Sequence, residues 1–232
     1  MKHSKIIATI FTIALSAIAV SAQKDQGKEL RDAVDRVNAA SAAINQIMRA
    51  SDKGIPRDLL NKAEAVVIFP GTIKAAFVVG GQGGTGVAIK RVGNGWSAPA
   101  FLKLGGGSFG AQIGGAKTDY ILLIMNDNGL KSLLSDKFEM GGEGSIVAGP
   151  VGRTAAASTT ATLGAQILTY SRSKGLFAGV SLKGVVITHD DDRNLAIYSK
   201  NANQILGTPP LAAHDAPSAL QRLGETLSTY SK

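Results

Sequence analysis

The chain has 232 residues, of which 44% are hydrophobic, 18% are charged and 28 are glycine, with a formal net charge of +8. This length allows one domain or two small ones, and the ordinary hydrophobic fraction with irregularly spaced glycine excludes collagen, a coiled coil and long disorder. The sequence has no cysteine, which excludes a disulfide scaffold, a thiolate nucleophile, a cysteine–zinc site and an iron–sulfur cluster.

The first 22 residues have the pattern of a secretory signal peptide. Lys2 and Lys5 form a basic start, residues 6–20 form an uncharged apolar run, and small residues end at Ala22. The run is shorter than the roughly 20 residues that a membrane-spanning helix needs. We therefore expect cleavage after Ala22, a mature chain without a transmembrane span that begins at Gln23, and a periplasmic or secreted location.

Residues 25–50 follow as a predicted helix, because apolar side chains recur at steps of three and four residues. We expect this stripe to dock on the body of the domain. A short helix with Pro56 in its first turn comes next. These elements, together with the leader, divide the chain into a signal peptide (1–22), an N-terminal helix (23–54), a domain body (55–207) and a C-terminal helical tail (208–232).

The body is predicted to be rich in β-structure. From residue 65, short β-type runs alternate with glycine, which favours an antiparallel sandwich or barrel over alternating β-α units. The predicted fold class is α+β, with N-terminal and C-terminal helices packed on this glycine-rich sheet. Further helices are expected at 128–134, 194–206 and 217–230, and Trp96 and Phe101 are expected in the core.

Two glycine-rich segments match sequence motifs that occur in enzymes. Residues 81–86 match the G-x-G-x-x-G pattern, but no helix or suitably placed acid follows, so we interpret them as a hairpin turn. Residues 106–110 match the G-x-S-x-G nucleophile elbow. The alternative function is therefore an envelope serine hydrolase that uses Ser108 with His189 or His214. The acidic run after His189 is interpreted as a cap for the following helix.

The charge is distributed unevenly along the chain. Residues 65–118 and 144–189 contain nine basic residues and no acidic one. Such a balance favours an anionic partner. Because nucleic acid is rare outside the cytoplasm, we expect membrane lipid rather than nucleic acid. The alternative is that the basic charge serves only to keep the protein soluble. No pattern in the sequence predicts a cofactor or a metal site.

Five ordered runs resemble the SYLF domain, a lipid-binding family of bacteria and eukaryotes. They read AVVIFP at 65–70, FVVGGQGGTGV at 77–87, GWSAPAF at 95–101, AGPVGR at 148–153 and YSRSKGLFAGV at 170–180. The resemblance covers residues 55–207 and implies a non-enzymatic module. Eukaryotic members bind phosphoinositides and other anionic phospholipids, and one yeast relative also binds actin. For an exported chain the implied ligand is an anionic phospholipid or another envelope lipid, and the actin role is not transferred.

Two sets of basic residues are the predicted lipid contacts. The first set lies in the acid-free stretches and consists of Lys74, Lys90, Arg91, Arg172 and Lys174. The second set recurs every four or five residues along the predicted helices, in the part of the family where membrane contact is usually placed, and consists of Arg49, Lys53, Arg57 and Lys62. Each cation near an anionic surface contributes about 1 kcal/mol, so we expect a weak, salt-sensitive association.

Overall fold

The computed structural model describes residues 2–49, 54–77, 79–108, 114–141, 146–152, 164–173, 176–180, 182 and 184–231. Side chains are described from residue 26 onward, except those of residues 75–79, 108, 114 and 115. The predicted contacts Lys53 and Lys174 lie outside the described residues.

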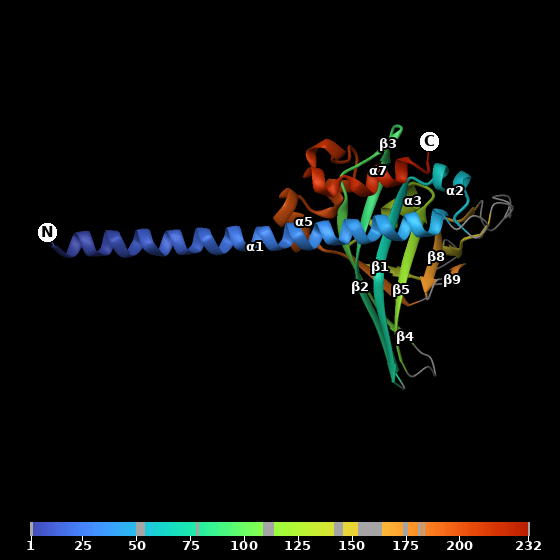
Figure 1. Cartoon of the computed structure of the whole chain (residues 1–232), viewed down its shortest axis with the longest axis horizontal. Coiled ribbons are helices and arrows are strands. Elements are labelled where there is room, and N and C mark those ends of the chain that lie inside the picture. The colour runs from blue at the N-terminus through green and yellow to red at the C-terminus, as the bar shows by residue number, and fades with distance from the viewer. Residues whose placement is uncertain are drawn as a thin grey trace.

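A long helix, α1 (Lys2–Arg49), opens the chain. Its C-terminal half lies across the sheet, whereas its N-terminal half projects from the body (Figure 1). The helix predicted over residues 25–50 is confirmed. Its buried side chains recur at steps of three and four residues, as the docking of one apolar stripe requires; they are Ala33, Val37, Ala40, Ala43, Ile44 and Ile47.

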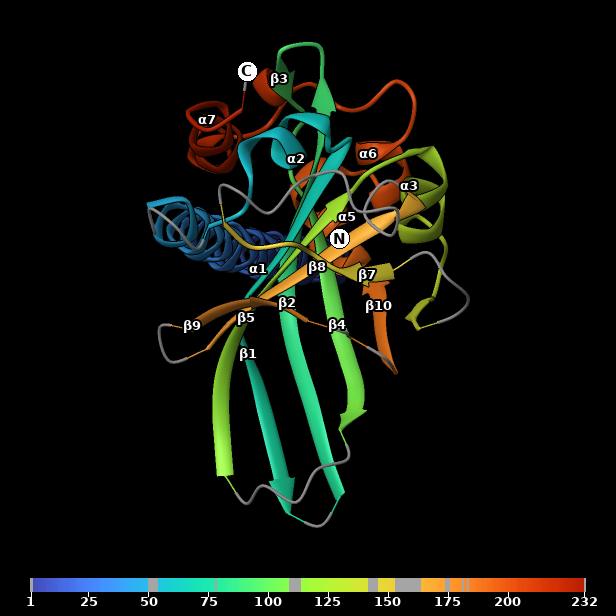
Figure 2. The ribbon, with the colours of Figure 1, turned by 90° about the vertical axis from the view of Figure 1, so that its right-hand side faces the viewer.

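Ten strands in the described part of the chain form one curled, nearly barrel-shaped sheet. Its order is β6-β10-β4-β2-β1-β5-β8-β7, with β3 on β2 and β9 on β8. All pairs are antiparallel except β7 with β8. The strands are β1 (Ala65–Phe77), β2 (Val79–Val92), β3 (Gly95–Trp96), β4 (Ala100–Ser108), β5 (Gly114–Ile124), β6 (Phe138–Met140), β7 (Ile146–Ala148), β8 (Ile167–Ser173), β9 (Leu176–Gly179) and β10 (Val185–His189). The predicted α+β class is confirmed, and the far ends of β1, β2, β4 and β5 extend well beyond the helices (Figure 2).

Short helices surround the upper part of the sheet. They are α2 (Arg57–Lys62), α3 (Asp127–Leu133), α5 (Asp191–Tyr198), α6 (Ala202–Leu206), α7 (Arg222–Ser228) and the 3₁₀ turns η1 (Ala213–Asp215) and η2 (Ser218–Leu220). The helix predicted at 128–134 corresponds to α3. The single helix predicted at 194–206 is instead two helices, because Ser199 adopts a left-handed conformation that ends α5.

The predicted acidic cap of α5 has a different role in the structure. Asp190 is the N-cap residue but makes no capping hydrogen bond through its side chain. It pairs with Lys103 at 2.8 Å and with Arg193 at 3.2 Å, and Arg193 also reaches Glu29 of α1 at 3.0 Å. This network ties α1 and α5 to β4.

The glycine motif at residues 81–86 is not a hairpin turn, contrary to the sequence-based expectation. It lies within β2, and the β1–β2 pairing ends with Phe77 opposite Val79 instead. Packing explains the glycines, since a Cβ atom on Gly86 would lie 2.4 Å from a ring carbon of Phe69 and one on Gly84 would lie 2.7 Å from the Thr72 hydroxyl. Glycine inside a strand marks this kind of close approach.

A bulge interrupts β1 in the middle of the sheet. The register with β5 shifts between Phe69 and Thr72, and Gly71 has a positive φ of 62°. The bulge accommodates Pro70, which has no N–H to donate to a central strand. It also leaves the Pro70 carbonyl and the Gly71 N–H available for contacts outside the strand ladder.

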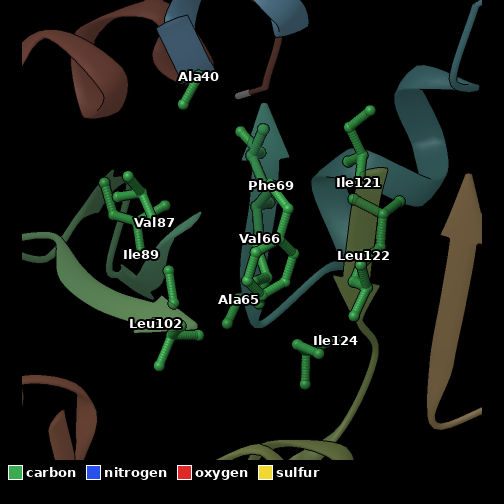
Figure 3. Close-up of a cluster of buried hydrophobic side chains, with 14 of the residues drawn as sticks. Ala40, Ala65, Val66, Phe69, Val87, Ile89, Leu102, Ile121, Leu122 and Ile124 are labelled. Atoms are coloured by element: carbon green, nitrogen blue, oxygen red, sulfur yellow. The ribbon is translucent and has the colours of Figure 1, made fainter. Parts of the chain in front are cut away.

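The core fills the space inside the sheet and beneath α1. Figure 3 shows part of it, with Ala40 of α1 facing the side chains of β1, β2 and β5. Trp96 and Phe101 are 5% and 0% exposed, so the prediction that they belong to the core is confirmed. Among the described residues, no helix is both long and apolar enough to cross a membrane.

Candidate functional site

Three of the predicted lipid contacts are exposed at one corner of the molecule. Arg49 ends α1, whereas Arg57 and Lys62 begin and end α2. The guanidinium of Arg57 lies 5.8 Å from the ring centroid of Tyr230, and the Tyr230 hydroxyl donates to Asn45 of α1 at 2.8 Å. No ion pair with a described residue neutralises these three cations. We call Arg49, Arg57 and Lys62 the α2 patch.

Lys90 and Arg91 are bound to the fold itself. The Lys90 ammonium donates to the Gly207 carbonyl at 2.8 Å. Arg91 donates from Nε to the Ala63 carbonyl at 2.9 Å and from a terminal nitrogen to the Leu60 carbonyl at 2.7 Å, and it lies 4.3 Å from the Trp96 ring centroid. Burial lowers the pKa of Arg91. Both side chains therefore fasten neighbouring segments to β2.

Lys62, Lys90 and Arg91 meet at a hollow of about 340 Å³ that we call the α2 hollow. Glu64 and Asp127 also line it, so three cations face two carboxylates. Burial, together with the neighbouring Asp127 carboxylate, raises the pKa of Glu64. The hollow is nearly balanced in charge.

Arg172 and Lys74 also have partners within the sheet. Arg172 of β8 donates from Nε and a terminal nitrogen to one oxygen of Asp119 on β5, at 3.0 and 2.6 Å. The other Asp119 oxygen accepts from the Gly71 N–H at 2.7 Å. The Lys74 ammonium lies 5.3 Å from the Tyr120 ring centroid, within cation–π distance.

A second hollow, of about 430 Å³, lies between α1 and the sheet, and we call it the α1 hollow. Its charged lining comes from Arg36 of α1, Lys117 and Asp119 of β5 and Arg172 of β8. Ala39, Ala42 and the β1 bulge at Pro70 and Gly71 complete the wall. Three cations here face one carboxylate, and that carboxylate is already bound by Arg172 and Gly71.

The sequence analysis did not select Arg36 or Lys117 as site residues. Arg36 lies on the face of α1 that includes several acidic side chains, and Lys117 is one of several lysines in an acid-free stretch. A signal was nevertheless present, since Pro70-Gly71 inside an apolar strand indicates a bulge, and bulges occur next to sites. The partners of that bulge depend on the strand order.

The geometry gives the hydrolase alternative no support. Ser108 is the last residue of β4 and is paired with Gly80, and the next described element is the strand β5 from Gly114, so the described residues show no helix after Ser108. His189 is paired with Leu102, six residues along the same strand and therefore about 20 Å from Ser108. His214 is exposed in η1, beside Asp215. Among the described residues, no group of three or more acidic or histidine side chains is arranged to hold a metal ion.

Comparison with known proteins places the sequence of this chain in a family. The family model described as Ysc84, Las17-binding protein actin regulator, matches residues 105–230. LAS seventeen-binding protein 3 of Saccharomyces cerevisiae is 35% identical over 170 residues, which are 72% of this chain and 37% of the relative. Protein YSC84 of the same yeast is 35% identical over 161 residues, which are 68% of this chain and 34% of the relative.

A human relative matches over a similar span. SH3 domain-containing YSC84-like protein 1 of Homo sapiens is 29% identical over 186 residues, which are 78% of this chain and 53% of the relative. The chain thus spans about a third to a half of the length of these relatives. The resemblance to the SYLF domain is confirmed, and the chain belongs to the Ysc84 (SYLF) family.

Proposed function

We propose that this protein is a non-enzymatic module of the cell envelope that binds anionic phospholipid headgroups at a membrane surface. The observation that carries the proposal is the α2 patch. Its three cations are exposed, and no described carboxylate pairs with them. Arg49, Arg57 and Lys62 can therefore meet an anionic surface without first breaking an ion pair with a described residue, although Arg57 also lies over the Tyr230 ring.

The size of the effect follows from the number of free cations. Each contributes about 1 kcal/mol near an anionic surface, so the α2 patch contributes about 3 kcal/mol. A free energy of this size corresponds to an association weaker than millimolar. Membrane binding through the patch alone is therefore weak and salt-dependent, because exposed charges are screened within about a Debye length.

The envelope location rests on the leader-like residues 1–22. A basic start, an apolar run and small residues ending at Ala22 support export and cleavage before Gln23. Sequencing of the N-terminus of the protein isolated from its own cells tests this part of the proposal. A start at Gln23 supports export, and an intact leader contradicts it.

The family description and the name of LAS seventeen-binding protein 3 both refer to binding of Las17. We do not extend that partner to this chain, because the residues matched are only part of each relative and the proposed location is outside the cytoplasm. A protein partner becomes the better hypothesis if the vesicle experiment fails.

The test is co-sedimentation of the purified protein with vesicles of phosphatidylcholine alone and with vesicles that also contain phosphatidylglycerol, at low and high salt. We expect binding to the anionic vesicles only, and release at high salt. The triple variant Arg49→Gln, Arg57→Gln, Lys62→Gln should bind about a hundredfold more weakly, because three contacts of about 1 kcal/mol are lost.

A matched control separates the patch from net charge. Lys28, Lys131 and Lys137 are exposed on other parts of the surface, and changing all three to glutamine removes the same charge. We expect this control variant to bind nearly as well as the unchanged protein. Equal losses in the two triple variants would contradict a localised patch, and absence of binding to anionic vesicles would reject the proposed function.

A further inference from the structure

The α1 hollow gathers basic side chains from distant parts of the sequence. Arg36 comes from α1, Lys117 from β5 and Arg172 from β8, and the adjacency of β1, β5 and β8 brings them together. Figure 1 shows α1 passing across these strands. The hollow is large enough for a small ligand, since its volume of about 430 Å³ lies within the usual range of ligand pockets.

Arg172 is held in place but keeps spare donors. Its Nε and one terminal nitrogen donate to a single oxygen of Asp119, and Gly71 fixes the other oxygen of that carboxylate. A guanidinium has five N–H groups, so this arrangement leaves the remaining N–H groups for another acceptor. Asp119 is therefore a positioning residue that orients Arg172 at the wall of the hollow.

Arg36 is only partly satisfied. One terminal nitrogen donates to the Pro70 carbonyl at 3.3 Å, whereas Nε is buried and has no hydrogen-bond partner among the described residues. Burial is the main cause that lowers the pKa of Arg36, which marks a cation whose loss of water is not fully compensated. An acceptor of negative charge would offset this cost.

Lys117 is the third cation of the lining and lies on its solvent-exposed side. It is exposed, and no described carboxylate forms an ion pair with it. With Arg36 and Arg172 it gives the lining three positive charges against the single negative charge of Asp119. The lining itself has a surplus of two positive charges, which matches a dianion, whereas Asp32, Asp35 and Asp190 act on Arg36 from outside the lining.

We infer that the α1 hollow binds the phosphate group of a phosphate monoester, with Arg36, Lys117 and Arg172 donating to its oxygens. A monoester carries a charge of about −1.5 to −2 and three acceptor oxygens near neutral pH, one for each cation. A phosphodiester has a single charge and two free oxygens, and it matches the lining less well. The inference deepens the proposed function and rests on it for the lipid source of the phosphate, the alternative source being a free phosphate monoester.

The position of the hollow fits a lipid headgroup. Gln46 of the lining is three residues before Arg49 of the α2 patch, so the two side chains share a face of α1. A lipid held by its phosphate in the α1 hollow would therefore keep the α2 patch close to the same membrane.

The test uses glycerol 3-phosphate as the monoester probe and glycerophosphoglycerol as the diester probe, with affinities measured by NMR titration of the purified protein. We expect glycerol 3-phosphate to bind at least about tenfold more tightly than the diester. The variant Lys117→Gln should weaken monoester binding about tenfold, because a charge-assisted hydrogen bond is lost. Lys131→Gln, an equally exposed change on α3, is the matched control and should have no effect.

A second variant leaves the charge unchanged. Ala42 is exposed on the wall of the hollow, so Ala42→Phe fills the space without entering the core and should abolish monoester binding. Thermal unfolding verifies that each variant is folded. Equal binding of the two probes, or equal effects of Lys117→Gln and Lys131→Gln, would overturn the inference.

Vesicles distinguish the two sources of the phosphate. Vesicles with phosphatidic acid present a monoester, and vesicles with phosphatidylglycerol at matched surface potential present a diester. A preference for phosphatidic acid that Ala42→Phe removes supports a lipid headgroup. Monoester binding in solution without this preference supports a free phosphate monoester in the same hollow. If mutation of the α2 patch removes all vesicle binding but leaves glycerol 3-phosphate binding intact, the result supports the α2 patch as the membrane contact. It leaves the inferred phosphate site in the α1 hollow standing.

Discussion

The α2 hollow and the α1 hollow contain the same number of cations but differ in what those cations contact. In the α2 hollow, Lys90 and Arg91 donate to backbone carbonyls, and two carboxylates face the three cations. In the α1 hollow, one carboxylate faces three cations, Arg36 keeps an unpartnered nitrogen and Lys117 has no described ion-pair partner.

The difference teaches that a basic residue indicates a binding site only when the fold leaves its donors free. Arg91 fastens β2 to the segment around α2 and stacks on Trp96, so its charge is part of the structure. Arg172 is also held in place, but by the Asp119 carboxylate, which orients the guanidinium and leaves some of its N–H donors free. The following changes test this contrast through stability, where the two hollows should respond differently.

The largest effect is expected for Arg91→Met in the α2 hollow. The variant keeps the apolar stem but loses two hydrogen bonds to carbonyls and the contact with Trp96, which should lower the free energy of unfolding by about 3 kcal/mol. Urea denaturation measures the change. Arg91→Lys keeps the charge without the planar fork and should recover little of the loss, whereas full recovery would show that charge alone matters there.

A smaller loss is expected for Asp119→Asn in the α1 hollow. The amide oxygen still accepts from the Gly71 N–H, but the ion pair with Arg172 is lost, which should cost about 1–2 kcal/mol in a partly buried site. The same denaturation experiment gives the value. An unchanged free energy of unfolding would mean that Asp119 does not hold Arg172 in place, and the arrangement of the α1 hollow would have to be revised.

The smallest effect is expected for Glu64→Gln in the α2 hollow. Burial and Asp127 raise the folded-state pKa of Glu64 above its ordinary value of 4.5, so ionisation of this carboxyl is disfavoured in the folded state. Stability due to the protonated form is present below the unfolded pKa and is lost as the pH rises through the folded pKa. The variant should therefore be slightly more stable than the unchanged protein near neutral pH, with no gain at about pH 4 or below.

Denaturation curves at several pH values measure this difference. A gain in stability at low pH, or a loss near neutral pH, would contradict the assignment of an unfavourable carboxylate to the α2 hollow.

Much of the fold was predictable because it depends on local patterns. The apolar stripe of residues 25–50 predicted the docked part of α1, and β-type runs between glycines predicted the sheet. The interpretation of residues 81–86 as a turn was wrong because a glycine forced by a neighbour such as Phe69 has the same appearance in the sequence as a glycine forced by a turn. Only the pairing of β1 with β2 distinguishes the two cases.

The residues of the two candidate sites differ in the same way: some could be selected from the local sequence, and others depend on the strand order. Arg49, Arg57 and Lys62 recur every few residues in the part of the family where membrane contact is usually placed, so the sequence could select them as predicted contacts. Arg36 and Lys117 were not selected, because their relation to Arg172 depends on the order β1-β5-β8 and on the bulge at Pro70. Contacts of this range follow from the topology and not from sequence spacing.

The most direct test of the account is to locate the surface that meets the membrane. The sequence has no cysteine, so a single introduced cysteine can be labelled with a fluorophore. Asp58 on α2 and Asp136 after α3 are both exposed aspartates, which makes Asp58→Cys and Asp136→Cys a matched pair. On anionic vesicles with quencher-labelled headgroups, we predict quenching of the label at position 58 and little quenching at position 136. Equal quenching, or stronger quenching at position 136, would contradict the assignment of the α2 patch as the membrane-binding surface.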